Sequence, residues 1–542
     1  MSPILGVIAD VDNNLSPLTS MHAISQLIND RWKQRLVVAL VPLMLSACAA
    51  LPDVSGRAPS KTITGSERTT LAKYIQPLLA AHPGQSGSHP MPNGQDGFAA
   101  RVALANAAQR SLDVQYFIWS KDITGQALLE SLVRAADRGV RVRVLLDDLG
   151  SAHSDRALLA LDSHPNIEVR LFNPVTFRSP KLVGMVAELS RIDRRMHNKS
   201  FIADGRVAIL GGRNIADEYF AARSGTNYAD LDVVTIGPVV KEVSNAFDLY
   251  WNSRPVIAIT DVAHQRPAEQ ELAAIRSGLT AEWSAARISA YGKSVRQSEF
   301  AQQLKAHRVS WFWSRSRVVT DNPEKALTSA TDESTHLAPK LRAEANATRK
   351  EMFLVSPYFV PRESGVSMLA ATRQRGVRVV VVTNSLASTD GKAAFSGYQA
   401  SRKALLRAGV DLYELKPKAG EERLRIRWAS PGSLGAGLHA KTFSFDRRSL
   451  FIGSFNLDPR SRDLNTEIGV LIDCPRLASR LPEKLGPTLA TEAYRVELEG
   501  NRLVWVTQED GREVRYYNEP ATTFGRRVST WLVGLLPIKG EL

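Results

Sequence analysis

This chain contains an internal duplication, which constrains its fold more than any other feature. Each copy places a lysine two positions after a histidine, an aspartate after four further residues, and a Gly-x-x-Asn segment after six more. The two copies share every one of these gaps. Their residues are His197, Lys199, Asp204, Gly211 and Asn214 in the first copy and His439, Lys441, Asp446, Gly453 and Asn456 in the second.

The segments ahead of the two histidines repeat as well. Residues 111–119 and 140–148 have the composition of strands, and residues 124–138 between them have helical spacing. The same order returns at 351–361 and 371–385, around a shared Arg-Gly-Val-Arg-Val. Strand–helix–strand units build sheets with helices packed on them. We therefore expect an α/β fold of two duplicated lobes, each a mixed, mostly parallel sheet flanked by helices, with one active site at the lobe interface.

The chain of 542 residues divides around these lobes. The stretch 81–97 is dense in Gly, Pro, Ser and Asn, which is typical of a tether or loop. Between the repeats the periodicity is weaker, which indicates a connector. We expect a signal peptide at 1–48, a flexible tether at 49–95, the first lobe at 96–255, a connector at 256–345, the second lobe at 346–480 and a C-terminal extension at 481–542.

Charge and cysteine content narrow the classes of partner. Lys and Arg number 69 against 55 Asp and Glu, which leaves a net charge of +14. Such an excess favours an anionic partner, such as nucleic acid, phospholipid head groups or phosphorylated metabolites. The two cysteines, Cys48 and Cys474, exclude a disulfide framework and a Cys-rich zinc site. Because the sequence also contains no HExxH motif or carboxylate cluster, we expect neither a metal nor a cofactor.

The N-terminal segment has the pattern of a targeting signal. Arg31, Lys33 and Arg35 precede the apolar run 36–45, which is too short to span a bilayer. The run ends in Leu-Ser-Ala-Cys48 and resembles a bacterial lipoprotein signal, in which Cys48 would carry the lipid. A simple secretory signal and a short buried helix are the alternatives.

The repeated residues suit chemistry at a phosphate group. Alternate residues of a strand share a face, so the histidine and lysine of each copy point the same way. Two facing copies would surround a tetrahedral phosphate with cationic donors, joined by the amides of Asn214 and Asn456 and the hydroxyl of Ser454. One neutral imidazole can then attack phosphorus while a protonated one gives the leaving alcohol its proton. The residues expected to be structural are Asp204, Asp446, Gly211 and Gly453.

Histidines in these roles need a carboxylate on the second ring nitrogen, which fixes tautomer and orientation. Glu467 follows His439 in the segment NTEIGVLI, and the matching segment after His197 is YADLDVVTI. The alignment of the two segments favours Asp230 as the counterpart of Glu467, with Asp232 as the competitor. The predicted catalytic set is therefore two histidines, two lysines, Asp230 and Glu467.

The paired motifs resemble those of the phospholipase D superfamily, and the resemblance covers about residues 96–480. Further stretches, among them LDVQYFIW (112–119), RRMHNKSFIADG (194–205) and GSFNLDPRS (453–461), are similar to bacterial cardiolipin synthases of the C type. This resemblance implies transfer of a phosphatidyl group from phosphatidylethanolamine to phosphatidylglycerol. It also implies that His197 forms a phosphatidyl-histidine and that His439 is the general acid.

Other functions remain open at this level. The same histidine pair could hydrolyse a phospholipid as a phospholipase D, or cut nucleic acid, and a non-catalytic lipid-binding protein could have inherited the fold. The completeness of both motifs argues against the last alternative. The lipoprotein-like signal makes nucleic acid an unlikely partner and favours phospholipids, with or without a helper protein.

The C-terminal segment has features of membrane contact. Residues 524–538 combine Arg526 and Arg527 with Trp531 and Leu532, as in an interfacial helix whose arginines meet lipid phosphates. A terminal helix packed on the second lobe is the alternative. Together with the signal, this segment leads us to expect a membrane-anchored lipoprotein on the periplasmic side, with the inner or outer membrane left open.

Overall fold

The computed structural model describes residues 51–222, 227–263, 269–417 and 435–535. The predicted signal peptide, with Cys48, lies outside these ranges. One compact unit comprises Leu51–Pro174 and Ser190–Leu542, and the segment Val175–Leu189, with helix α6 (Lys181–Ala187), belongs to a second unit. Everything described below concerns the first of these units.

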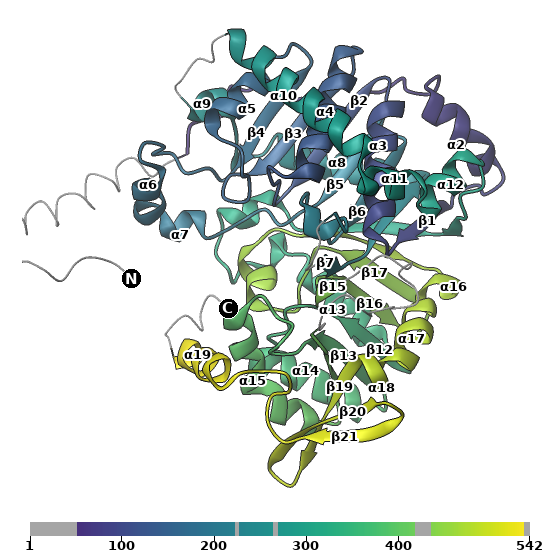
Figure 1. Cartoon of the computed structure of the whole chain (residues 1–542), viewed down its shortest axis with the longest axis vertical. Coiled ribbons are helices and arrows are strands. Elements are labelled where there is room, and N and C mark those ends of the chain that lie inside the picture. The colour runs from purple at the N-terminus through teal and green to yellow at the C-terminus, as the bar shows by residue number, and fades with distance from the viewer. Residues whose placement is uncertain (1–50, 223–226, 264–268, 418–434, 536–542) are drawn as a thin grey trace, which may run out of the picture. The chain divides into compact units, whose positions relative to one another are not determined.

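Two large sheets carry the fold (Figure 1). The first has nine strands in the order β10-β1-β8-β6-β5-β2-β3-β4-β9, and the second has ten in the order β11-β18-β17-β16-β12-β13-β14-β19-β20-β21. Six successive strands match between the two orders, because β8-β6-β5-β2-β3-β4 of the first correspond to β18-β17-β16-β12-β13-β14 of the second. The duplication of the sequence is therefore a duplication of topology.

In each sheet the strands β2 to β4 or β12 to β14 alternate along the chain with helices, and the later strands form hairpins. The first sheet contains β1 (Ser86–Met91), β2 (Ser111–Tyr116), β3 (Arg141–Asp147), β4 (Ile167–Phe172), β5 (Ser200–Ala203), β6 (Val207–Gly211), β8 (Asp232–Ile236), β9 (Val256–Ala258) and β10 (Phe312–Ser314). The second contains β11 (Ser316–Thr320), β12 (Glu351–Val355), β13 (Arg378–Asn384), β14 (Asp411–Leu415), β16 (Lys441–Phe445), β17 (Ser449–Gly453), β18 (Ile468–Ile472), β19 (Ala493–Glu499), β20 (Arg502–Glu509) and β21 (Arg512–Tyr516). Two short strands, β7 (Asn227–Ala229) and β15 (Gly435–Leu438), pair in parallel.

Helices flank both sheets. Those of the first repeat and the segment after it are α2 (Thr70–Ala80), α3 (Gly94–Ala107), α4 (Ile123–Asp137), α5 (Asp155–Asp162), α8 (Pro238–Trp251), α10 (Glu269–Ile288), α11 (Ala290–Arg296) and α12 (Glu299–Lys305). Those of the second repeat and the C-terminal part are α13 (Ala338–Ala347), α14 (Arg362–Gln374), α15 (Lys392–Arg407), α16 (Pro475–Ala478), α17 (Arg480–Leu485), α18 (Leu489–Glu492) and α19 (Phe524–Leu535). Helix α4 begins at Asp122, whose side chain accepts the N–H of Gly125, and it ends before Gly139, whose φ of 87° stops the helix.

The predicted α/β class is confirmed. Parallel pairing joins β2 to β3 and β3 to β4, and likewise β12 to β13 and β13 to β14, because an intervening helix returns the chain to the same end of the sheet. The strands that follow the histidines form antiparallel hairpins, β5 with β6 and β16 with β17. The sheets are therefore mixed, as expected.

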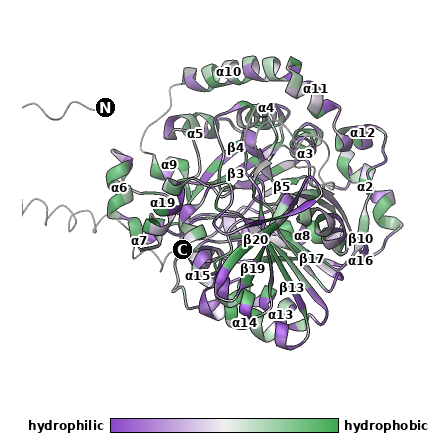
Figure 2. Ribbon diagram, turned by 60° about the horizontal axis from the view of Figure 1, so that its bottom comes forward, coloured by the Kyte–Doolittle hydropathy of each residue, from purple (hydrophilic) through white to green (hydrophobic). Residues whose placement is uncertain are grey.

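The hydrophobic core explains how the two sheets come together. Hydrophobic residues are concentrated on the strands, whereas outer helices such as α10 mix hydrophobic and hydrophilic residues (Figure 2). One cluster of buried side chains joins the two sheets, with Ile202 and Val233 from the first and Ile452 and Val470 from the second. Each lobe also has a core of its own beneath its helices. Because the inner faces of both sheets are apolar, the sheets pack face to face.

The tether predicted at 49–95 is wrong. Residues 86–91 form β1, which lies between β8 and β10 inside the first sheet. Further upstream, Arg57 donates to the carbonyl of Val256 at 2.7 Å, and the N–H of Thr62 donates to Asp248 at 2.8 Å. The polar composition of 81–97 misled the prediction, because sheet pairing fixes the backbone of β1, while Ile75 of α2 and Met91 of β1 are buried in the core of the first lobe.

The connector and the extension are also more integrated than predicted. Within the connector, β9 and β10 complete the two edges of the first sheet, and β11 forms an edge of the second. In the extension, β19, β20 and β21 widen the second sheet beyond β14. The sequence analysis missed these additions. β9 and β10 have only three residues each, and β19 to β21 lie beyond the part of the chain that repeats.

Candidate active site

The two histidine segments occupy equivalent places in the two lobes. His197 comes just before β5 and His439 just before β16, so each imidazole lies at the start of the first strand of a hairpin. The backbone N–H of His197 donates to the carbonyl of Thr466 at 2.8 Å, and that of His439 donates to the carbonyl of Ala229 at 2.8 Å. Each histidine segment is thus bound to the segment of the opposite lobe that carries the predicted carboxylate.

The carboxylates cross between the lobes. Nδ1 of His197 lies 2.9 Å from a carboxylate oxygen of Glu467, which belongs to the second lobe. Nδ1 of His439 lies 2.6 Å from a carboxylate oxygen of Asp230, which belongs to the first. Because an ionised carboxylate only accepts hydrogen bonds, both Nδ1 atoms carry their protons, and Nε2 is the acceptor nitrogen of each ring. Nε2 of His439 lies 3.0 Å from Nζ of Lys441, which can donate to it.

The competing carboxylate, Asp232, is used elsewhere. It accepts a hydrogen bond from Arg101 at 2.9 Å and one from the backbone of Arg213 at 3.2 Å, and its side chain is fully buried. Of the two aspartates in this segment, only Asp230 reaches a histidine in the structure.

The difference between Gly212 and Ser454 has a geometric reason. A Cβ atom at position 212 would lie 2.2 Å from Oδ1 of Asp230, so the carboxylate occupies the space of a side chain. In the other copy the hydroxyl of Ser454 donates to Glu467. Ser454 was predicted to bind the substrate phosphate, but its hydroxyl is directed at the carboxylate and is fully buried. Its position makes it a support for Glu467.

The two asparagines have different surroundings in the two lobes. The amide nitrogen of Asn214 donates to the hydroxyl of Tyr219 at 2.9 Å, and its oxygen accepts the N–H of Ile118 at 3.2 Å. In this structure Asn214 therefore holds the loop after β6. Asn456 is 4 % exposed, and its side-chain oxygen makes no hydrogen bond. The predicted role of Asn456 as a phosphate donor stays a prediction.

The turn aspartates have matching contacts. Asp204 accepts the backbone N–H of Arg110 at 2.7 Å, and Asp446 accepts that of Lys350 at 2.7 Å. Both residues have a φ of 53°, in the left-handed region that aspartate tolerates in turns. Each carboxylate ties the hairpin turn to the start of the neighbouring strand.

Burial and charge set the protonation of the site. Burial lowers the pKa of His197 to about 4 and also lowers that of His439, so both imidazoles are neutral at neutral pH in the free protein. Burial opposes ionisation of Asp230, but the nearby His439 and Lys441 outweigh it and lower the pKa of Asp230 to about 2. The pKa of Glu467 is likewise lowered, because His197 and Lys199 outweigh the effect of burial.

The two lysines are almost fully buried beside the histidines. Nζ of Lys441 lies 2.5 Å from the carbonyl of His439, and Nζ of Lys199 contacts that of His197 in the same way. Burial lowers the pKa of Lys199 to about 7 and that of Lys441 to about 8, with Lys441 further lowering the pKa of Lys199. The lysines therefore influence one another across the lobes, which indicates one shared site for an anion.

Aromatic residues complete the site, and the sequence analysis missed them. The ring of Phe117 lies 5.2 Å from that of His197, and the rings of Tyr219 and Tyr228 lie 5.0 and 5.3 Å from that of His439. Phe117 belongs to the strand segment that supported the resemblance, but a strand with many aromatic residues gives no sign of which ring faces the site.

A buried ion pair supports the first histidine. The guanidinium of Arg195 binds Asp147 through Nε and Nη2 at 2.8–3.0 Å, and the same carboxylate accepts the N–H of Met196 at 2.9 Å. Arg195 comes two residues before the histidine, so this pair fixes the path of the chain into the site. Across the described ranges, no group of three His, Cys, Asp or Glu side chains is placed to hold a metal ion.

Comparisons with known proteins agree with this geometry. The family model described as "Cardiolipin synthase, PLD-like domain" matches residues 102–251 and 341–486, which contain both histidine motifs. "Cardiolipin synthase C" of Escherichia coli (strain K12) is 41% identical over 471 residues, covering 86% of this chain and 99% of the relative. The chain belongs to the cardiolipin synthase family with phospholipase D-like domains.

More distant relatives of the cardiolipin synthase family share the same fold. "Cardiolipin synthase B" of Escherichia coli (strain K12) is 24% identical, covering 75% of this chain and 81% of the relative. The crystal structure of phosphatidylserine synthase from Haemophilus influenzae Rd KW20 has a TM-score of 0.50 and 15% identity, covering 78% of this chain and 91% of that one. This last likeness supports the fold alone. The duplicated phospholipase D-like architecture is thereby established.

Proposed function

We propose that this protein is a phosphatidyltransferase that forms cardiolipin by moving a phosphatidyl group from one phospholipid to phosphatidylglycerol. The observation that carries the proposal is the pairing of two buried His-Lys sets, in which each imidazole is held by a carboxylate of the opposite lobe. The similarity to Cardiolipin synthase C over 86% of the chain supports the same reaction.

In the first half-reaction, Nε2 of His197 attacks the phosphorus of the donor lipid. A P–N bond forms and the P–O bond to the head-group alcohol breaks. His439 in its protonated form gives the leaving oxygen its proton, while Lys199 and Lys441 stabilise charge on the other phosphate oxygens. Entry of an anionic phosphate favours protonation of His439, because an opposite charge nearby raises the pKa of an imidazole.

In the second half-reaction the roles reverse. Neutral His439 takes the proton from the hydroxyl group of phosphatidylglycerol, and the resulting oxygen attacks phosphorus. The P–N bond then breaks and His197 is restored. Water entering instead of the lipid alcohol would give phosphatidic acid by hydrolysis.

The supports of the two histidines favour His197 as the nucleophile. Glu467 accepts hydrogen bonds from the hydroxyls of Ser454 and Ser461 as well as from His197, which fixes the carboxylate rigidly. A rigid carboxylate holds the ring of His197 in the orientation that attack requires. His439 has the shorter contact with its carboxylate, at 2.6 Å, which suits an imidazole that becomes positively charged.

The donor is proposed to be phosphatidylethanolamine, as in the C-type cardiolipin synthases that the sequence resembles. Incubating the purified protein with labelled phosphatidylethanolamine and phosphatidylglycerol in vesicles tests the proposal. Cardiolipin with released ethanolamine is the expected result. Phosphatidic acid alone would indicate hydrolysis, and the absence of both products would contradict the proposal.

We further propose that the protein is anchored by a lipid on Cys48 at the periplasmic side of a membrane. The signal-like segment before Cys48 and the exposed apolar side chains of α19 support a membrane location. Within the described residues, none of the helices combines the length and the apolarity that crossing a bilayer requires. Mass analysis of the N-terminus of membrane-extracted protein tests the anchor, and an unmodified chain beginning at Met1 would contradict it.

A further inference from the structure

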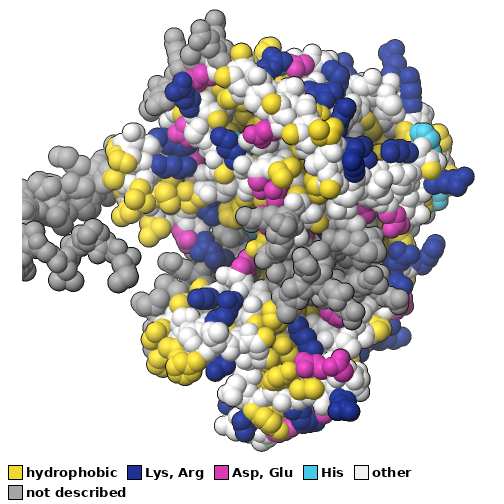
Figure 3. Space-filling model, viewed as in Figure 1, with side chains coloured by type: hydrophobic (Ala, Val, Ile, Leu, Met, Phe, Trp, Pro, Cys, Tyr) yellow, Lys and Arg dark blue, Asp and Glu magenta, His cyan; other side chains and the backbone are white. Residues whose placement is uncertain are grey.

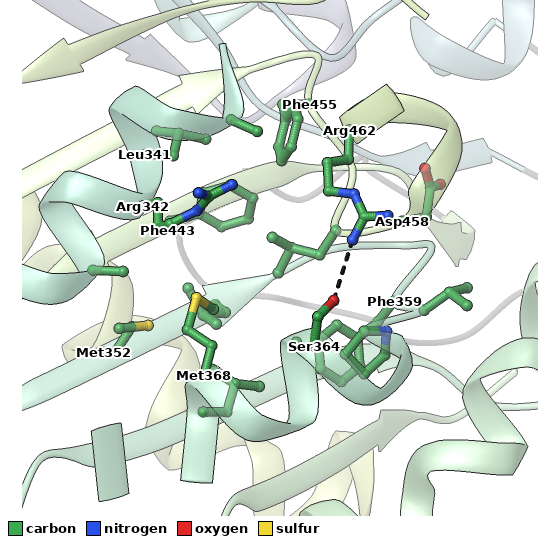
Figure 4. Close-up of a pocket in the computed structure, with 18 of the residues that line it drawn as sticks. Leu341, Arg342, Met352, Phe359, Ser364, Met368, Phe443, Phe455, Asp458 and Arg462 are labelled. Carbon is green, nitrogen blue, oxygen red and sulfur yellow. Dashed lines mark hydrogen bonds between the residues drawn. The ribbon is translucent and has the colours of Figure 1, made fainter. Parts of the chain in front are cut away.

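The second lobe contains a cavity of about 480 Å³ between its sheet and the helices α13 and α14 (Figure 4). Leu341 of α13 and Met368 of α14 form one side, and Met352 of β12 and Phe443 of β16 form the floor. The lining is predominantly apolar, and the volume lies in the range of about 300–1,000 Å³ that is usual for small-molecule sites. A cavity of this size and composition could hold the apolar part of a ligand.

The first lobe shows that the fold does not demand this cavity. Asp204 and Asp446 bind the strand segments 109–111 and 349–351, which makes Arg101 of α3 the counterpart of Leu341. By the spacing of the two motifs, Arg213 is the counterpart of Phe455.

These two arginines fill the space beneath α3. Arg101 and Arg213 are each 1 % exposed, and both lie within salt-bridge distance of Asp232. Arg101 also donates to the hydroxyl of Tyr116 at 2.8 Å. Between helix and sheet, the first lobe thus has a charged, hydrogen-bonded cluster where the second has leucine and phenylalanine beside a cavity. The first lobe does have a cavity beside α3, but residues of α4, α11 and α12 also line it, and the arginine cluster occupies the space next to the sheet.

The cavity shares a wall with the proposed active site. Phe455 and Leu457 line the cavity, while Ser454, the residue before them, donates to the catalytic Glu467. Asp458, at the end of the same loop, also lines the cavity. The charges of Lys441 and Glu467 both shift the pKa of Asp458, which shows that this residue is near the active site. One loop therefore separates the reacting phosphate from the apolar space.

The cavity has polar groups beside the loop 454–458 and a second charged pair, Arg342 with Glu333, of which Arg342 lies beside Leu341 and Phe443 in Figure 4. Asp458, Arg462 and Ser364 lie on one side in Figure 4, where Arg462 donates to the hydroxyl of Ser364 at 3.4 Å. Met352 and Met368 lie on the opposite side. This arrangement fits an amphiphilic ligand whose polar part is near the catalytic loop and whose hydrocarbon part extends toward the methionines. Methionine side chains adapt to chains of different shape.

We propose that this cavity binds one acyl chain of the phospholipid whose phosphate is at the two histidines. The inference rests on the proposed function, because it assumes a phospholipid at the site. Each methylene group buried in such a cavity strengthens binding about fourfold. The cavity therefore makes turnover depend on chain length.

Photolabelling tests the location without requiring turnover. Phosphatidylglycerol carrying a diazirine at the end of one acyl chain is irradiated with the full-length protein in detergent micelles. We expect labelled peptides that contain Met352, Met368 or Phe443, and we expect excess unlabelled long-chain lipid to suppress the label. Label found only on α19 or other surface helices would overturn the inference.

A cavity-filling variant tests the consequence. Ala345→Phe, on α13, places a ring in the cavity, and Met368→Phe is a second variant should the first fail to fold. Ala103→Phe is the matched control, because Ala103 lines a separate cavity beside α3 in the first lobe. All variants are compared with wild type for transfer from dihexanoyl and from dioleoyl lipid, and thermal unfolding verifies folding.

The two outcomes separate this inference from the proposed function. We expect the filled variants to lose the preference for dioleoyl lipid by about tenfold while retaining dihexanoyl transfer, and Ala103→Phe to behave as wild type. Transfer with an unchanged chain preference in a folded Ala345→Phe or Met368→Phe protein would overturn the inference alone. Label in the cavity without transfer of any lipid would uphold chain binding and contradict the proposed function.

Discussion

The carboxylate of Asp230 lies 2.6 Å from Nδ1 of His439, although the two residues are 209 positions apart and belong to different lobes. The reciprocal pair, Glu467 and His197, is separated by 270 positions. Neither lobe therefore contains a histidine together with the carboxylate that holds it. The two lobes depend on each other for the orientation of both imidazoles as well as for packing.

Asp230→Asn and Glu467→Gln are expected to lower kcat by about 10²–10⁴-fold with little change in KM, because an amide no longer selects the tautomer that leaves Nε2 free. Steady-state transfer kinetics in mixed micelles measure the effect. Asp204→Asn is the control, because that carboxylate binds only backbone N–H groups and should lower stability while the folded protein keeps its kcat. Equal kcat for Asp230→Asn and wild type would contradict the assignment.

Exchange of small residues beside the carboxylates should have unequal effects in the two lobes. Gly212→Ala puts a Cβ atom 2.2 Å from Asp230 Oδ1 and must displace the carboxylate, so we expect a loss of kcat comparable to that of Asp230→Asn. Ser454→Ala removes the hydroxyl that donates to Glu467 and accepts the N–H of Ile468 at 3.0 Å, but it adds no clash, and it should cost about 1–2 kcal/mol in transition-state stabilisation. An equal kcat for Gly212→Ala and Ser454→Ala would contradict the idea that the close packing of Asp230 against position 212 is needed for catalysis.

Binding of a phosphodiester should weaken as pH rises. The pKa of Lys199 is lowered to about 7 and that of Lys441 to about 8, so both ammonium groups lose their charge as pH rises through this window. Glycerophosphoglycerol, whose single negative charge is constant here, should inhibit about tenfold more weakly at about pH 9 than at about pH 6.5.

Lys199→Gln supplies the control for this pH dependence. This variant should bind the inhibitor more weakly than wild type at low pH. Its affinity should also change less between low and high pH, because one of the two titrating ammonium groups is gone. Affinity that is independent of pH in the wild-type protein would show that the lysines do not bind the phosphate.

A buried ion pair beside the site should dominate local stability. Asp321, in the connector, accepts the N–H of Glu467 at 2.7 Å and binds Lys325 at 3.1 Å, with both side chains fully buried. Asp321→Ala leaves the ammonium group without its partner and should lower the free energy of unfolding by about 3–5 kcal/mol. Denaturant unfolding measures this change, and the double variant Asp321→Ala/Lys325→Met should recover part of it. No recovery would mean that the buried charge is not the cause.

Helix α19 should contribute to membrane binding. Its side chains Phe524, Trp531 and Leu532 are 75, 61 and 51 % exposed, and hydrophobic side chains gather there in Figure 3. Trp531→Ser with Leu532→Ser is expected to weaken sedimentation with phosphatidylglycerol vesicles by about tenfold. Leu249→Ser, at an apolar residue of α8 that is 46 % exposed, is the control and should have no effect.

The structure changes one detail of that helix. Arg526 and Arg527 were expected to meet lipid phosphates, but Arg526 donates to the carbonyls of Leu386 and Thr389, and Arg527 to Thr522. Arg526 therefore fastens α19 to the second lobe, whereas Arg527 binds the segment just before the helix. The helix packs on the second lobe, as the alternative interpretation expected, and it still exposes apolar side chains, so contact with a membrane stays a prediction.

The repeated motif could be interpreted from the sequence because its geometry is local. A histidine and a lysine two positions apart share a strand face in any context, and an Asp-Gly pair turns the chain into a hairpin wherever it occurs. The strand–helix–strand order likewise follows from periodicity along the chain. These features determined the duplication and the α/β class, and they located the paired histidines and lysines.

Only the tertiary structure decided which carboxylate binds which histidine. Glu467 follows His439 in the chain but binds His197, because the two sheets pack face to face and bring the end of one repeat against the start of the other. For the same reason Ser454 supports a carboxylate, and Asn214 holds a loop. In the second lobe Leu341 and Phe455 line a cavity next to the sheet. At the equivalent place in the first lobe, Arg101 and Arg213 fill the space. Such pairings depend on contacts between residues far apart in sequence, which spacing along the chain does not encode.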